Sequence, residues 1–217
     1  MIDFERMIAN HLARESYPKE PGRYYPSAIG MCLRKYWYSY KYPQEIEPRL
    51  RKIFHLGNVL HDFVVDVLRS EKNPDVELLE AETPVRLQHN DFVISGRIDD
   101  VLLIKEKEKT ILVEVKSVKD IKYQAAPSSH HIMQLQFYMY ATGIHNGIIL
   151  YLDKVALDTK IFEIGYDEEQ AKSILKRFEK FHNFLTNDTL PEAEAKQNEN
   201  TKWLCRFCEY KERCDGE

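Results

Sequence analysis

The 217-residue chain has no long hydrophobic run and no excess of positive charge. No apolar stretch approaches the ~18 residues of a membrane-spanning helix, and the N-terminal residues do not form a secretory signal peptide. We therefore predict an intracellular, cytoplasmic protein that acts without a membrane. A net charge of −4 and a pI near 6.1 exclude a globally basic nucleic-acid binder, so any such contact must come from local patches.

Cysteine is also scarce: the chain has Cys32, and then Cys205, Cys208 and Cys214 close to its end. In a reducing compartment, thiols grouped in this way are typical of metal ligands rather than of disulfides. Four thiolates suit structural zinc or an iron–sulfur cluster, and one Cys-x2-Cys pair with two single cysteines favours the cluster slightly. Zinc and a buried core role for Cys32 stay open, whereas a redox sensor would need an exposed thiol of low pKa and is not favoured. One shared centre would join the N-terminal region to the C-terminus.

Two predicted strands, Phe92–Ile104 and Ile111–Ser117, flank a charged turn at Lys105–Lys109. Alternate residues of a strand point to the same side, so Glu114 and Lys116 share a face. A largely apolar strand does not carry two charges without a reason.

A turn centred between Lys107 and Glu108 would place Asp99 directly opposite Lys116 and diagonal to Glu114. Two carboxylates on one face can hold magnesium or manganese. A neighbouring lysine can orient the attacking water or stabilise the charge that builds on a phosphate. The set therefore suits phosphodiester hydrolysis, and the alternative is a structural ion pair on a half-exposed hairpin.

The remaining periodicity predicts an α/β fold with a mixed central β-sheet flanked by helices. Asp167 is expected to cap the last long helix, and Gln170 to complete a capping box. A polar linker is expected between Pro191 and Asn200. The other expected helices are Met1–Arg14, Ser27–Tyr42, Ile53–Ser70 and Ser129–Thr142, and the other expected strands are Val85–Leu87, Gly147–Leu152 and Lys160–Ile164.

Seven aromatic residues interleaved with arginine and lysine lie between Tyr24 and Tyr42. Stacking faces among cations are typical of a path for single-stranded nucleic acid. Helical periodicity favours a core role for at least Tyr36 and Tyr40, so stacking and core packing both stay open.

Two further segments offer side chains to the site. His61, on the helix predicted over Ile53–Ser70, is a candidate for the third metal ligand, although a lone histidine is more often a surface or hydrogen-bonded residue. On the helix predicted over Ser129–Thr142, Gln134 and Tyr138 lie one turn apart, in a stripe with His131, and can reach a phosphate or the lysine.

Together these residues form an ordered series of motifs. The series resembles the RecB-like branch of the PD-(D/E)XK nuclease superfamily and, with the cysteines, the CRISPR-associated Cas-four exonucleases. Its members are Gly57-x3-His61, Gly96-Arg-Ile-Asp99, Glu114-Val-Lys116, Gln134-x3-Tyr138, and Cys32 with Cys205-x2-Cys208-x5-Cys214.

The resemblance implies a restriction-endonuclease-like core and a role for each matched residue. His61, Asp99 and Glu114 would bind manganese or magnesium, and Lys116 would be the catalytic lysine, with Asp99 preferred over its neighbour Asp100. Gln134 and Tyr138 would support the lysine and the DNA. The cysteines Cys32, Cys205, Cys208 and Cys214 would hold a structural 4Fe-4S cluster.

The implied activity is metal-dependent degradation of single-stranded DNA or DNA ends, with 5′ to 3′ polarity favoured. CRISPR adaptation with integrase partners is the implied context, and a homo-oligomer is compatible with it. A standalone repair, recombination or viral nuclease is the first alternative, and a non-catalytic iron–sulfur DNA-binding subunit is another. We expect a single domain with an N-terminal helical region (1–52), a nuclease core (53–186) and a linker with the cysteine segment (187–217).

Overall fold

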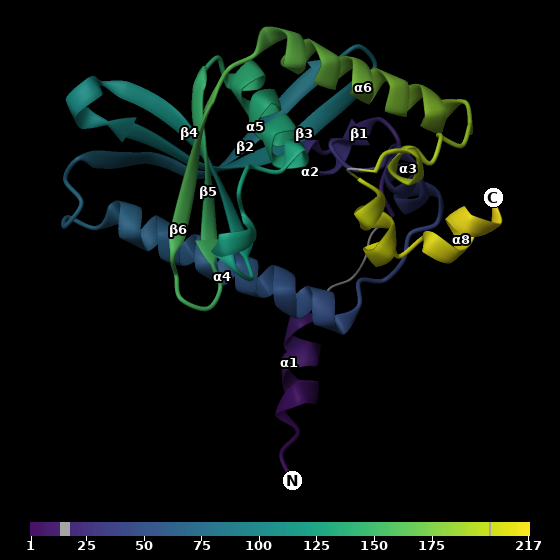
Figure 1. The fold of residues 1–217 in the computed structure, drawn as a ribbon, viewed down its shortest axis with the longest axis horizontal. Helices are drawn as coiled ribbons and strands as arrows, with labels where there is room; N and C mark the ends of the chain where they lie inside the picture. The colour runs from purple at the N-terminus through teal and green to yellow at the C-terminus, as the bar shows by residue number, and fades with distance from the viewer. Residues whose placement is uncertain (14–17, 200) are drawn as a thin grey trace.

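A computed structural model describes residues 1–13, 18–199 and 201–217. Its centre is a mixed six-stranded sheet in the order β1-β3-β4-β5-β6, with β2 also paired to β3 (Figure 1). The β1–β3 and β4–β5 pairs are parallel, and the other pairs are antiparallel. The strands are β1 Arg23–Tyr24, β2 Val76–His89, β3 Phe92–Ile104, β4 Lys109–Val118, β5 Asn146–Asp153 and β6 Thr159–Gly165.

Helices lie on both faces of the sheet, as the sequence predicts. Along β5, Ile149 and Tyr151 pack in the cluster that includes α5 and α6, whereas Leu150 and Leu152 pack against α4. This alternation follows from the two-residue period of a strand. The longer helices are α1 Phe4–Leu12, α3 Leu33–Lys41, α4 Pro48–Arg69, α5 Ser129–Thr142 and α6 Glu168–Thr186.

The short helices are α2 Pro26–Ile29, α7 Glu194–Gln197, α8 Lys211–Gly216 and the 3-10 turns η1 Lys105–Lys107, η2 Ile121–Tyr123 and η3 Lys202–Phe207. None of the helices in the described ranges is long and apolar enough to cross a membrane.

The single helix predicted over Ser27–Tyr42 is wrong, because the chain breaks between α2 and α3. Pro26 begins α2, and Cys32 is the N-cap residue of α3. The break lies at Gly30, where an added Cβ would come 2.6 Å from the backbone of His130 in α5. Close contact with α5 therefore sets the position of Cys32.

The predicted stacking path between Tyr24 and Tyr42 is largely buried. Tyr24 and Tyr38 are fully inaccessible, and Tyr36 packs parallel to Phe181 of α6 at a ring separation of 4.2 Å. Trp37 and Tyr40 are buried as well. These aromatic side chains form the core between α3, α6 and the sheet, so they are not a surface for nucleic acid.

The apolar side chains of α4 are only partly buried. Leu60 and Val64 are buried against the sheet, but an adjoining stripe of α4 is exposed, namely Leu56, Val59, Phe63 and Val67. The predicted helix at Met1–Arg14 forms as α1, which has no buried residue and projects away from the body (Figure 1). Arg14 lies outside the described residues.

The central hairpin forms with a register two residues away from the predicted one. Asp100 lies opposite Val113, so Asp99 does not face Lys116. The chain reverses through η1 and through Glu108, whose positive φ of 47° makes the turn shorter than the one we assumed. A shift of two residues preserves the face of every side chain, whereas a shift of one would reverse it.

The helix predicted after Asp167 forms as α6. The Asp167 carboxylate accepts the Gln170 backbone N–H at 3.0 Å, as a cap should. The Gln170 side-chain oxygen has no partner among the described residues, so the reciprocal half of the predicted capping box is absent there.

Candidate active site

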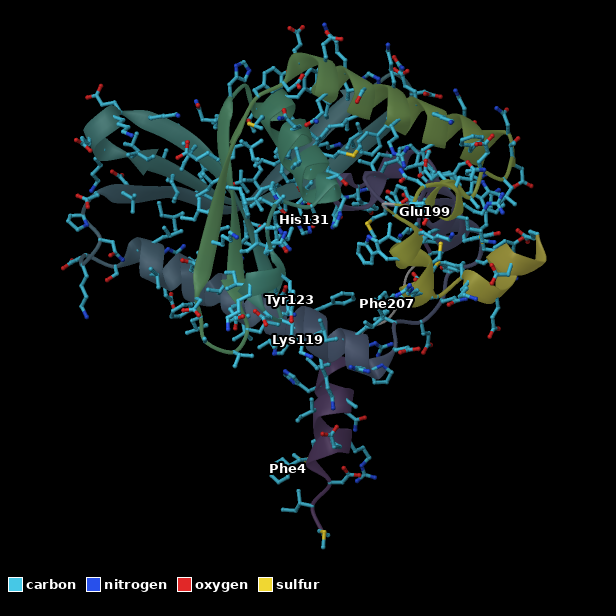
Figure 2. The ribbon with its side chains drawn as sticks, viewed as in Figure 1. Phe4, Lys119, Tyr123, His131, Glu199 and Phe207 are labelled. Carbon is cyan, nitrogen blue, oxygen red and sulfur yellow. The ribbon has the colours of Figure 1, made fainter. Side chains whose placement is uncertain are left out.

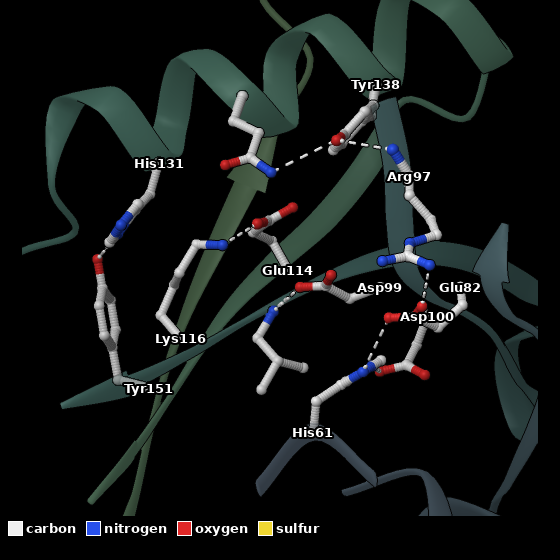
Figure 3. A network of polar contacts seen from close by, with 12 residues as sticks. His61, Glu82, Arg97, Asp99, Asp100, Glu114, Lys116, His131, Tyr138 and Tyr151 are labelled. Atoms are coloured by element: carbon white, nitrogen blue, oxygen red, sulfur yellow. Dashed lines mark hydrogen bonds and ion pairs between the residues drawn. The ribbon is translucent and has the colours of Figure 1, made fainter. Parts of the chain in front are cut away.

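The hairpin brings Asp99, Glu114 and Lys116 together, as Figure 3 shows. Glu114 is completely buried, and its Oε1 accepts a hydrogen bond from the Lys116 ammonium. Asp99 Oδ2 accepts the backbone N–H of Val115 at 2.8 Å, which holds its carboxylate beside β4 between the other two residues. The predicted convergence therefore occurs, although through a different register.

His61 reaches the same region from α4. Its Nδ1 lies 3.3 Å from Glu82 Oε1, and its Nε2 lies 3.3 Å from Asp100 Oδ2. One ligand atom each from His61, Glu82 and Asp99 lie within 4.8 Å of one another. These three side chains could hold a divalent cation, and Asp99 is the member of the Asp99–Asp100 pair that belongs to the group.

Glu82 is a candidate ligand that our sequence analysis missed. It lies on β2 after a register shift between Leu78 and Glu80, and its φ of 56° is unusual for a residue other than glycine. Its second oxygen is 2.6 Å from Arg97 Nη1, which fixes the carboxylate. None of the sequence motifs lies on β2, and no regular spacing relates Glu82 to them. The sequence therefore gave no signal that Glu82 belongs to the site.

Burial dominates the electrostatics of the carboxylates. It raises the pKa of Asp99 and of Glu114, although the Lys116 ammonium opposes both shifts. Burial alone would lower the pKa of Lys116, but Glu114 and Asp99 more than offset it, so the pKa is raised and the lysine is charged. The hydrogen bond to Asp100 raises the pKa of His61.

Two carboxylate oxygens in this group are buried without a hydrogen-bond partner among the described residues, Asp100 Oδ1 and Glu114 Oε2. A buried polar atom left unpaired costs roughly 1–3 kcal/mol, and more when it is charged. A cation among these carboxylates would offset that cost. The donor set of carboxylate oxygens and one imidazole suits magnesium or manganese.

Gln134 and Tyr138 project from α5 towards the same strands. The Tyr138 hydroxyl accepts the backbone N–H of Arg97 at 3.2 Å and the side-chain N–H of Gln134 at 3.4 Å. A Cβ at position 96 would lie 2.7 Å from that hydroxyl, which explains Gly96. Within the described chain neither side chain has a hydrogen bond to Lys116, so their support of the lysine stays a prediction.

All four cysteines line one cavity of about 210 Å³ between α3, α5 and the C-terminal segment. The cavity also contains His130 of α5 and Phe207, the latter labelled in Figure 2. Burial raises the pKa of the Cys205 thiol, and the nearby Cys32 and Cys214 add to the shift. Among the described residues, no three sulfur atoms lie within 4.8 Å of one another.

Polar contacts tie the two cysteine-bearing segments together. The backbone N–H of Leu33 donates to Glu194 Oε1 at 2.7 Å, and Arg34 Nε donates to the Pro191 carbonyl at 2.7 Å. Arg177 of α6 donates to the Met31 carbonyl at 2.9 Å and pairs with Glu194. The segment around Cys32 is therefore held to the segment that precedes the C-terminal cysteines by bonds that involve no cysteine.

A mixed sheet with helices on both faces, carrying acidic residues and a lysine on one hairpin beside a histidine, defines a class of nucleases. The sequence pattern of the PD-(D/E)XK nuclease superfamily matches residues 32–215. The chain belongs to this superfamily and is a nuclease.

The chain is also similar to one exonuclease in sequence and to two solved structures in fold. The CRISPR-associated exonuclease Cas4 of Saccharolobus solfataricus is 24% identical over 211 residues, which cover 97% of this chain and 94% of that protein. The crystal structure of SSO0001 superposes with a TM-score of 0.63 at 23% identity, over 95% of this chain and 90% of the other. LHK-Exo in complex with dAMP gives a TM-score of 0.57 at 15% identity, over 85% and 93%.

Proposed function

We propose that the chain is a metal-dependent exonuclease that degrades single-stranded DNA. The observation that carries the proposal is the convergence of His61, Glu82 and Asp99 beside the buried Glu114–Lys116 pair, in a chain of this nuclease superfamily. We assign manganese or magnesium to His61, Asp99 and Glu114, with Glu82 as a further ligand.

A divalent ion held there would acidify a bound water and offset negative charge on the scissile phosphate. The side chains of the protein would supply the rest of the chemistry. Lys116 points its ammonium at the carboxylates, where it can stabilise charge on the phosphate or orient the attacking water. Val115 fixes Asp99 through its backbone, and Arg97 fixes Glu82, so both carboxylates are positioned before substrate binds.

We further propose that Cys32, Cys205, Cys208 and Cys214 hold a structural 4Fe-4S cluster. The support for one shared centre is that all four cysteines line the same cavity. The cluster would bridge segments that polar contacts already place side by side.

The deciding experiment is digestion of single-stranded DNA labelled at its 5′ or 3′ end, with manganese or magnesium, by the wild type and the Lys116→Ala variant. Metal-dependent degradation that is lost in the variant would support the site. Release of the 5′ label first would support 5′ to 3′ polarity. A folded, iron-loaded wild type that does not cleave would favour the second candidate, a non-catalytic DNA-binding subunit.

For the biological context we propose CRISPR adaptation, alongside integrase proteins. The support is the 24% identity to the Cas4 exonuclease over nearly the whole chain. A standalone repair, recombination or viral nuclease would have the same site, so co-purification with integrase proteins from the native host is the test.

A further inference from the structure

A histidine outside the proposed metal site lies next to Lys116. Lys116 of β4 pairs with Tyr151 of β5, and the Tyr151 hydroxyl is 2.8 Å from His131 Nδ1 in the first turn of α5 (Figure 3). The Lys116 ammonium is close enough to contribute to the pKa of His131. His131 has no role in the function proposed above.

The hydrogen bonds of Tyr151 determine which nitrogen of His131 carries the proton. The hydroxyl accepts the backbone N–H of Ser128 at 3.0 Å. Tyr151 is fully buried, and His131 Nδ1 is the only acceptor near its hydroxyl in the described chain. The O–H therefore donates to Nδ1, and the imidazole proton must lie on Nε2.

His131 is also neutral at ordinary pH. Burial, with smaller contributions from the neighbouring His130 and Lys116, lowers its pKa to about 2. The ring is held between the Tyr151 hydroxyl and the His130 ring, whose centroid is 4.0 Å away. Its Nε2–H is thus a fixed, uncharged donor.

This donor is available to a ligand. Nε2 of His131 has no hydrogen bond in the described structure. If Nε2 were also fully buried, it would belong to the few buried side-chain atoms without a partner, and it does not. It must therefore retain some solvent access. In Figure 2, His131 lies at the end of α5 that faces the C-terminal cysteine segment.

We propose that His131 Nε2–H donates a hydrogen bond to a phosphate oxygen of the DNA strand next to the phosphodiester at Lys116. The proposal rests on the nuclease function above and gives that site a substrate-binding residue. A donor already oriented by Tyr151 loses little conformational entropy on binding. Because it carries no charge, it adds to Lys116 without repelling it.

Two substitutions separate this role from a structural one. The amide of His131→Asn ends near the position of Nδ1, so it can keep the Tyr151 contact but cannot reach the phosphate. The amide of His131→Gln ends near Nε2, so it can keep a donor there and loses the Tyr151 contact. His145→Phe, in the loop between the C-terminal end of α5 and β5, is the matched control.

The measurement is fluorescence anisotropy of a short labelled oligothymidylate with each full-length variant, in calcium to prevent cleavage. We expect His131→Asn to weaken binding about tenfold, the range for a hydrogen bond to a charged group, and His131→Gln to stay close to the wild type. Wild-type affinity in His131→Asn together with a loss in His131→Gln would overturn the proposal.

Single methylphosphonate substitutions along the oligonucleotide then locate the contact. The loss in His131→Asn should disappear when one particular phosphate is neutral, because the two changes remove the same interaction. A loss that is equal at every position would mean that His131 acts only through the fold. A wild type that shows the position-specific pattern but does not cleave this DNA would refute the proposed exonuclease activity and leave the phosphate contact standing.

Discussion

Gly30 lies directly against His130: a Cβ at Gly30 would be 2.6 Å from the His130 Cα and 2.7 Å from its Cβ. The loop that leads to Cys32 therefore rests on the first turn of α5. The same helix carries Gln134 and Tyr138, so one element positions both the cysteine cavity and part of the candidate active site.

Gly30→Ala should destabilise the protein, because the atoms that the new methyl group meets include backbone atoms that cannot rotate away. We expect a loss of roughly 1–3 kcal/mol, as for other overpacked sites, and a lower iron content because Cys32 moves. Denaturant unfolding and iron analysis measure the two effects. Gly165→Ala is the control, since nothing lies within 4 Å of the added methyl. Equal stability of both variants would contradict the prediction.

Lys116→Ala should reduce cleavage at least ~100-fold, the usual effect of removing a group that stabilises transition-state charge. The fold should persist, because burial already raises the pKa of Glu114 and the carboxyl can take up a proton once its partner is gone. Steady-state cleavage and circular dichroism test this, with exposed Lys107→Ala as control. A variant that cleaves normally would remove Lys116 from the mechanism.

Glu82→Gln should weaken manganese binding by about tenfold or more, since even indirect contacts to metal ligands are worth ~10–100-fold. Arg97→Ala is the informative comparison, because it removes the ion partner of Glu82 and leaves the carboxylate in place. Titration calorimetry with manganese measures both variants. If Glu82→Gln binds manganese as the wild type does, Glu82 serves only to hold Arg97 and His61.

Cys32→Ala should lower iron content and the thermal midpoint together, as Cys205→Ala should, because each would remove one ligand of the proposed cluster. The segments should remain adjacent, since Leu33 and Arg34 keep their bonds to Glu194 and Pro191. Metal analysis and visible absorption of anaerobically purified protein provide the measurement. Unchanged iron in Cys32→Ala would exclude it as a ligand, and stoichiometric zinc would exclude the cluster without affecting the nuclease site.

Several elements were predictable because their signals are local. The 3.6-residue pattern over Ser129–Thr142 and the Asp167 cap are properties of neighbouring residues, and both helices form as expected. The error in the predicted hairpin register also has a local cause. The hairpin register depended on one turn residue, Glu108, adopting a positive φ that its side chain does not favour.

The sequence by itself determined the chemistry: a buried carboxylate and lysine two residues apart, a histidine on a preceding helix, and four thiols. These features depend on residue type, which the sequence gives directly. A charged side chain in an apolar strand is also a signal of function, because burying a charge costs much free energy. Only the tertiary structure decided which groups meet. It added Glu82 from a strand that no motif marks, buried the aromatic residues near Tyr36, and set His131 against Tyr151. Such contacts depend on how elements that are distant in the sequence pack against one another, so residue spacing along the chain does not predict them.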